Sequence, residues 1–208
     1  MREGLRDRKK REARQHISDT ATRLFAQRGF EAVTVAEIAE AAGVAKATVT
    51  NYFPRKEDLL LDLQPEAEQL LVDALRGRPP GQSAVEAVRA LMHRLLAQKH
   101  PLSGVAPGTA RFGRLMAESP ALLSRAREQR ESLESAVARL LVEETGDPVR
   151  ADLVARLLLA TATTVVVTAI RRLIAGDPAV TVATDQKRVI DEAFDLLAAG
   201  IHTFGGDS

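Results

Sequence analysis

The sequence of 208 residues has no cysteine and no tryptophan, and aromatic residues make up only 3 % of it. The absence of cysteine excludes disulfide bonds, zinc fingers and thiol catalysis. With so few aromatic residues, leucine, alanine and valine must build the core, which favours packed helices. No alternating apolar pattern is long enough for a sheet, although the β-branched run Thr161–Val167 fits a helix least well. The sequence therefore predicts an all-α fold.

Long hydrophobic runs are also absent. The longest charge-free apolar stretch in the second half covers residues 157–170, which is 14 residues, whereas a bilayer span needs about 20. We interpret this stretch as part of a helix that is apolar nearly all round and buried on several sides. The start of the chain, Met1-Arg2-Glu3, is polar and unlike a secretory signal, so we expect a cytoplasmic protein.

Charge is distributed unevenly along the chain, although the formal net charge is only +1. Residues 1–60 hold 12 Lys and Arg against 9 Asp and Glu, and the first 14 residues alone hold seven basic and three acidic side chains. The remainder of the chain has a slight acidic excess. This asymmetry suits a polyanionic partner near the N-terminus, but a solvated basic tail has the same composition.

An amphipathic helix and a short second helix are predicted in the first 43 residues. An apolar stripe runs through Arg8–Arg28, and Gly29 follows as a helix stop. Thr34 and Glu37 then have the spacing of a capping box, and the helix that they open ends at Gly43. Apolar spacing between the cap and the glycine gives this second helix one inward face.

A third short helix is predicted over Ala45–Tyr52, and Pro54 ends it. Two short helices joined by a tight glycine turn are typical of a helix-turn-helix. The outer side of the third helix suits entry into a DNA groove, because Asn51 can pair with a base edge while Lys46 and Lys56 can neutralise phosphates. Short helices joined by glycine also occur in helical proteins of other functions, so this pattern alone leaves DNA binding open.

Capping and stop signals predict helices along the rest of the chain. A fourth helix starts near Arg55 and kinks or restarts at Pro65. The later helices are expected over about residues 83–100, 109–118, 120–145 and 148–175, and a last one starts at Thr184–Asp185 and ends near Phe204.

Residues 11–63 resemble the N-terminal domain of the TetR family of regulators, and two stretches carry the resemblance: Leu24–Val44 and Lys46–Glu57. The resemblance implies an all-helical fold of about nine or ten helices. A three-helix DNA-binding head would occupy residues 1–54, and a larger ligand-binding and dimerisation domain would occupy residues 55–208. It also implies a ligand-responsive regulator, most often a repressor that a small-molecule effector releases from a palindromic DNA operator.

The resemblance also implies which side chains meet DNA, with Thr34 on a phosphate and Lys56 on another. The full set carried over by motif position is Thr34, Lys46, Ala47, Thr48, Thr50, Asn51, Tyr52 and Lys56. Two positions depart from the family pattern. Thr50 stands where a tyrosine is common, which puts that contact in doubt, and Ala45 stands where serine is common, which weakens the helix cap.

Threonines in the apolar helix 147–176 have two interpretations. Their hydroxyls can bond back to their own helix, or some of them can line an effector pocket. The candidate pocket residues are Met92, His93, Phe112, Met116, Arg127, Thr161, Thr164 and Thr168. The segment Gly4–Lys10, together with Asn51–Pro54, also resembles a subgroup whose sensor domain is likened to acyl-CoA binders, which implies a hydrophobic or acyl-CoA-like effector.

The last predicted helix has two apolar stripes. One can face the core of its own subunit, and the other, which includes small residues, can accept a partner helix in a homodimer. The candidate interface residues are Val189, Ala193, Leu196, Leu197, Gly200 and Phe204. The alternative is one thick core contact without dimerisation.

Two other classes of function compete with a DNA-binding regulator. An enzyme would need a nucleophile with a base, a metal cluster or a phosphate loop. The four histidines, at positions 16, 93, 100 and 202, are scattered, and no glycine loop ends in Gly-Lys-Ser/Thr. We therefore expect neither catalysis nor a metal site nor a cofactor. The second alternative is a helical protein-interaction module that has lost DNA binding.

Overall fold

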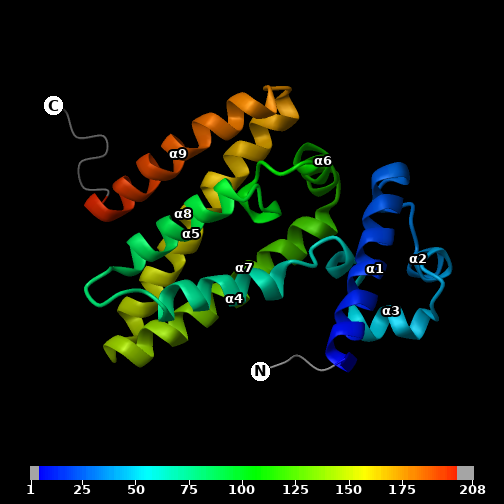
Figure 1. Ribbon diagram of the computed structural model, residues 1–208, viewed down its shortest axis with the longest axis horizontal. Helices are drawn as coiled ribbons and strands as arrows, with labels where there is room; N and C mark the ends of the chain where they lie inside the picture. Colours follow the sequence, from blue (N-terminus) through cyan, green and yellow to red (C-terminus); the bar gives the residue numbers. More distant parts are fainter. Residues whose placement is uncertain (1–4, 201–208) are drawn as a thin grey trace. The chain divides into compact units, whose positions relative to one another are not determined.

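The computed structural model describes residues 5–200, and over this range the chain forms nine α-helices, two 3-10 helices and no strand (Figure 1). The all-α prediction is confirmed. The helices are α1 Leu5–Arg28, α2 Val35–Ala41, α3 Lys46–Tyr52, α4 Gln64–Arg76, α5 Ala84–Ala97, α6 Thr109–Glu118, α7 Pro120–Thr145, α8 Pro148–Ala175 and α9 Ala179–Ala199, with the 3-10 helices η1 Lys56–Leu59 and η2 Pro101–Ser103.

The chain packs as two compact units. Of the described residues, the head unit contains 5–62 together with Arg114–Arg127, and the core unit contains Leu63–Gly113 and residues 128–200. Helices α6 and α7 therefore each contribute residues to both units.

Apolar side chains from α1, α2 and α3 build the centre of the head unit. Ile17 and Phe25 of α1, Ile38 of α2 and Val49 of α3 are completely buried. The rings of Phe25 and Phe30 lie 4.9 Å apart between centroids. Burying each of these side chains contributes about 1.5–3 kcal/mol, so this cluster fixes how α3 is presented.

The core unit is a helical bundle in which α9 packs on α8 and on α5, and α4 packs on α5. Leu75, Leu158, Ile190 and Phe194 are buried to 1 % exposure or less at its centre. A close approach between α6 and α8 is made possible by Gly113 of α6. A Cβ atom there would lie 2.4 Å from Cγ2 of Ile170 and 2.8 Å from Cδ1 of Ile174.

The helix expected near Arg55 is interrupted. A 3-10 helix, Lys56–Leu59, is followed by a turn, and α4 begins at Gln64 with Pro65 in its first turn. Of the two alternatives at Pro65, the structure has a restart and not a kink. Proline has no N–H to donate and its φ suits the first turn of a helix, so it begins α4 without breaking a hydrogen bond.

The predicted start of the last helix at Thr184–Asp185 is wrong, because α9 begins at Ala179 after the N-cap Pro178. The hydroxyl of Thr184 donates to the carbonyl of Val180 at 2.8 Å, so it bonds inside the helix and caps nothing. The pair Thr184-Asp185 gave a local signal for a cap, and the helix starts five residues earlier. The predicted end near Phe204 lies outside the described residues.

Helix α8 is less buried than the sequence predicted. Leu153 is 56 % exposed and Leu157 is 44 % exposed. In the most apolar 18-residue stretch of α8, only 28 % of the residues are buried. Among the described residues, α8 is the one helix long and apolar enough to cross a membrane by length and composition, a test that core helices of soluble proteins also pass. The expectation of burial on several sides is therefore wrong for the single chain.

Candidate nucleic-acid interface

Helix α2 begins at the capping box that the sequence predicted. The amide of Glu37 donates to Oγ1 of Thr34 at 3.2 Å, and the Thr34 amide and hydroxyl each donate to Oε2 of Glu37 at 2.8 Å. Arg28 donates to the other carboxylate oxygen at 2.7 Å. These bonds, the Thr34 backbone amide first, lower the pKa of Glu37 from its ordinary value of 4.5 to about 2.

The turn between α2 and α3 requires a glycine. Gly43 has φ +65°, in the left-handed region, and the amide of Val44 returns to the carbonyl of Ala39 at 3.0 Å. Ala45 then caps α3 without a side-chain hydrogen bond, as expected from alanine at this position. The orientation of α3 therefore depends on its packing and not on its cap.

Helix α3 has one buried and one exposed side. Val49 and the following Phe53 are buried in the head unit. The exposed positions are Lys46, Ala47, Thr50 and Asn51, while Thr48 and Tyr52 are half-buried. The sequence therefore placed the outer side correctly.

Thr50 and Lys56 direct their polar atoms toward the protein. The hydroxyl of Thr50 donates to the carbonyl of Ala47 at 3.1 Å, so its methyl group is what remains to offer a ligand. The ammonium of Lys56 lies 4.3 Å from the centre of the Phe30 ring and donates to the carbonyl of Glu31 at 3.4 Å. A phosphate at Lys56 would have to replace this carbonyl, so the predicted contact competes with an existing one.

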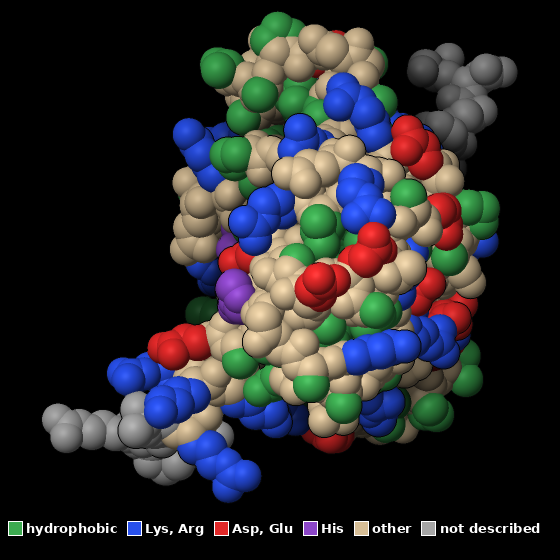
Figure 2. All heavy atoms as spheres, turned by 90° about the vertical axis from the view of Figure 1, so that its right-hand side faces the viewer, with side chains coloured by type: hydrophobic (Ala, Val, Ile, Leu, Met, Phe, Trp, Pro, Cys, Tyr) green, Lys and Arg blue, Asp and Glu red, His purple; other side chains and the backbone are tan. Residues whose placement is uncertain are grey.

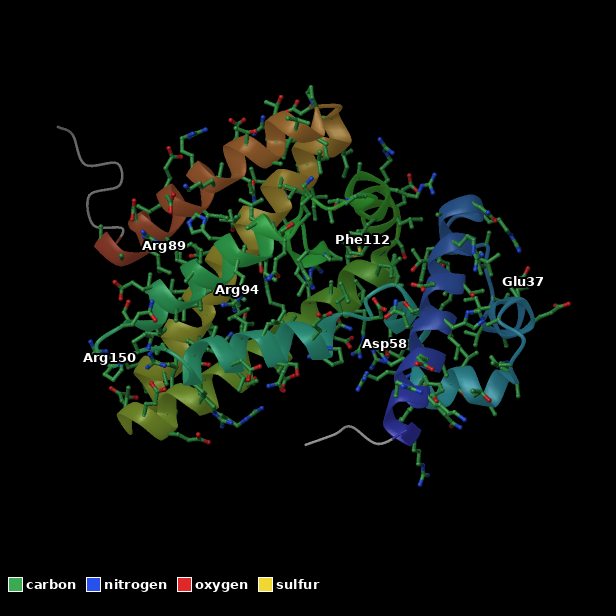
Figure 3. All side chains as sticks on the ribbon, viewed as in Figure 1. Glu37, Asp58, Arg89, Arg94, Phe112 and Arg150 are labelled. Atoms are coloured by element: carbon green, nitrogen blue, oxygen red, sulfur yellow. The ribbon has the colours of Figure 1, made fainter. Side chains whose placement is uncertain are left out.

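Two contacts from residues 114–127 hold the head unit together and were missed by the sequence analysis. Nε of Arg125 lies 2.7 Å from Oδ1 of Asp58, whose side chain is 11 % exposed. Figure 3 labels Asp58 in the segment between α3 and α4. The hydroxyl of Ser119 donates to Glu31 at 2.7 Å. These partners are 67 and 88 residues apart, so no local pattern points to them.

The predicted pocket residues are divided between the two units. Met116 and Arg127 belong to the head unit, whereas the other six belong to the core unit. Met92 is buried in the core, and Nε2 of His93 lies 2.7 Å from Oδ1 of Asp191. Within the core unit, a hollow of about 470 Å³ is lined by α4 and α7 and contains none of these predicted residues.

The threonines of the apolar helix α8 can be compared with other threonines in the same structure. The hydroxyl of Thr145, like that of Thr184, bonds back to its own helix at 2.8 Å. Over residues 5–200, no such bond is found for Thr161, Thr164 or Thr168, and Thr164 is exposed. This geometry disfavours the interpretation in which their hydroxyls are satisfied within α8.

The predicted dimer residues lie on α9 and at its end. Val189, Ala193 and Leu197 are half-buried against the core of their own subunit, whereas Leu196 is 43 % exposed. Gly200 caps the helix, and Phe204 lies outside the described residues. An exposed apolar surface is therefore present on α9 at Leu196 and more extensively on α8.

Residues 17–63 match the family model described as bacterial regulatory proteins of the tetR family. The HTH-type transcriptional regulator TcmR of Streptomyces glaucescens is 31 % identical over 147 residues, which cover 69 % of this chain and 65 % of that protein. The match thus spans slightly less than two thirds of the relative's length. This relative is named as a regulator, which agrees with the expectation that the chain is not an enzyme.

Two solved structures have the same fold. Thermus thermophilus FadR, a TetR-family repressor in complex with lauroyl-CoA, is 27 % identical with a TM-score of 0.52, covering 94 % of this chain and 98 % of that one. Pseudomonas aeruginosa NalD, the secondary repressor of the MexAB-OprM efflux pump, is 18 % identical with a TM-score of 0.58, covering 89 % of this chain and 96 % of that one. The matched segment 17–63 forms a helix-turn-helix on this fold, so the chain is similar to the tetR family of bacterial regulatory proteins both in that segment and in its helical architecture.

Proposed function

We propose that this chain is a cytoplasmic transcriptional repressor that binds a palindromic DNA operator as a homodimer and leaves it when a small-molecule effector binds. The observation that carries the proposal is the exposed side of α3. Lys46, Ala47, Thr50 and Asn51 are available on it, while Val49 anchors the opposite side in the core. An exposed short helix fixed by its buried face is the arrangement that enters a major groove.

The proposed contacts divide into phosphate contacts and base contacts. Lys46 neutralises a phosphate, and Thr34 meets another at the start of α2, where the helix dipole favours an anion. Asn51 hydrogen-bonds a base edge, and the methyl of Thr50 contacts a thymine methyl. The complete set proposed to face DNA, all within residues 1–54 except the last, is Thr34, Lys46, Ala47, Thr48, Thr50, Asn51, Tyr52 and Lys56.

The proposed dimer covers the exposed leucines of α8. Val149, Leu153 and Leu157 recur at helical spacing along one side of α8, and Leu196 adds an exposed leucine from α9. Water contact along such a stripe is unfavourable, and a second copy of α8 and α9 would bury it in a four-helix bundle. Two heads about 34–36 Å apart would then meet successive major grooves.

For the effector we propose a hydrophobic, acyl-CoA-like molecule bound in residues 55–208. The resemblance of the N-terminal segment to acyl-CoA-responsive regulators supports this class, as does the likeness to FadR, whose structure holds lauroyl-CoA. The proposed lining residues are those of the predicted set that lie in the core unit, namely Met92, His93, Phe112, Thr161, Thr164 and Thr168. By linkage, an effector that prefers a conformation with misplaced heads lowers DNA affinity by the same factor by which DNA lowers effector affinity.

Selection of bound duplexes from a random pool tests the proposal. We expect a two-fold symmetric consensus, and Lys46→Ala should weaken binding to all duplexes while Asn51→Ala should mainly relax the consensus at one position per half-site. Lack of preference for any duplex, even at low salt, would overturn the proposal. Equal binding by both variants and the parent would show that α3 is not the recognition helix.

A further inference from the structure

A basic cleft lies in the head unit beside the recognition helix. It has a volume of about 560 Å³ and is lined by Arg6, Lys9 and Lys10 of α1 and by Tyr52 of α3. Three of its four lining residues are cations, and none is an acid. Lys and Arg side chains gather over the start of α1 at the lower left of Figure 2.

The spacing of the three cations places them on one side of α1, because residues three and four apart are neighbours on a helix. The same side continues along α1 to Arg14, whose guanidinium lies 4.6 Å from the centre of the Phe53 ring, and to the buried Ile17. The core-facing stripe of α1 thus becomes basic where α1 extends past the core. A merely solvated tail has no reason to direct its charges to this side.

The cations of the basic cleft line one hollow, and an anion bound there would relieve the repulsion between their like charges. Arg8 lies in the same segment but is outside the cleft, and its Nε is 3.5 Å from Oε1 of Glu12. Arg8 is therefore already compensated by an acidic side chain, whereas the lining of the basic cleft contains no acidic side chain.

We propose that the basic cleft binds backbone phosphates of the same duplex that α3 reads, next to the base pairs contacted by Asn51. This inference rests on the proposed DNA-binding function. Tyr52 belongs to both the cleft and the recognition helix, so an anion held in the cleft continues the surface that α3 presents. Ammonium and guanidinium groups bind phosphate oxygens without reading sequence, so the cleft adds affinity and fixes the register of the head.

The salt dependence of operator binding tests this inference. The variant Lys9→Ala/Lys10→Ala should weaken binding and flatten the plot of log affinity against log salt by about one unit for each phosphate that the protein no longer neutralises. The matched control is Arg8→Ala, which removes a charge from the same turn of α1 outside the cleft and should change the slope less for each charge removed. The variant Lys9→Arg/Lys10→Arg keeps both positive charges and should have the same slope as the parent protein.

The possible outcomes separate this inference from the proposed function. If the parent protein selects a consensus but the cleft variant and Arg8→Ala flatten the slope equally for each charge removed, the cleft is only part of a solvated basic tail and the inference fails alone. A changed consensus in the cleft variant would also overturn it, because phosphate contacts carry no sequence information. If the parent selects no duplex, the proposed function itself has failed.

Discussion

Glu37 joins the start of α2 to the end of α1. Its carboxylate accepts two bonds from Thr34 and one from Arg28, and these bonds require the charged form. Thr34 is also a proposed phosphate ligand, and both of its donors are used by Glu37. Glu37 thus orients α2, the helix that precedes the recognition helix. Its charge therefore matters for the stability of the head unit more than for that of the core unit.

The low pKa of Glu37 predicts a pH-dependent contribution to stability. Because the pKa falls from 4.5 to about 2 on folding, the contribution is complete above pH 4.5 and is lost as the pH falls toward 2. We expect Glu37→Gln to lower the melting temperature at pH 7 and to differ little from the parent near pH 2. Thermal melts across this range check it, with the exposed Glu40→Gln as control. A constant difference at all pH values would contradict the expectation.

Local and distant contacts of single residues were not equally predictable. Thr34 and Glu37 meet because a helix brings residues three apart together, so their capping box was predicted from the sequence. Lys56 could equally have projected into solvent, and only the folded position of Phe30 places a ring beneath its ammonium. The ion pair of Arg125 and Asp58 joins parts of the chain that no local spacing connects.

At the scale of helices, the packing of α6 against α8 depends on a glycine. Gly113 lets α6 approach Ile170 and Ile174 of α8 within the core unit. Helix starts were predicted well where a side chain caps the helix, as at Ser83, whose hydroxyl accepts from the amide of Glu86 at 3.2 Å. The start of α9 was predicted poorly, because the hydroxyl of Thr184 bonds inside the helix and does not cap it.

Gly113→Ala should destabilise the protein although alanine favours helices by about 1 kcal/mol over glycine. The new Cβ would meet Cγ2 of Ile170 at 2.4 Å, and overpacking of this kind costs about 1–3 kcal/mol. Urea unfolding measures the difference. In the background Ile170→Ala, which removes the nearer clashing methyl group, Gly113→Ala should destabilise less, because only the 2.8 Å contact with Cδ1 of Ile174 remains. Equal destabilisation in both backgrounds would show that the close approach to Ile170 is not the cause.

For the whole molecule, the exposed side of α8 is the feature that a single chain leaves unexplained. The sequence predicted burial on several sides for this helix from its composition, yet Leu153 and Leu157 are exposed in the described chain. A homodimer that covers them reconciles the composition with the structure and also supplies the second head for a palindromic site.

Leu153→Asp/Leu157→Asp should convert the protein to a folded monomer with weak operator binding. Both side chains are exposed, so the charge opposes dimer contact without entering the subunit core. Sedimentation gives the mass, and circular dichroism checks the fold. Leu123→Asp, at a leucine 38 % exposed on α7, is the control and should remain dimeric. A parent that sediments as a monomer, or a variant that still dimerises, would remove α8 from the interface.

The sequence by itself determined the helical class, most helix ends and the outer side of α3, because these depend on composition and on residues within one or two turns of each other. The tertiary structure decided where Lys56 and Arg125 find their partners, that residues 114–127 pack with the head unit, and that Arg6, Lys9 and Lys10 share a cleft with Tyr52. Those relations join distant parts of the chain, and only the packing of the cores brings them together.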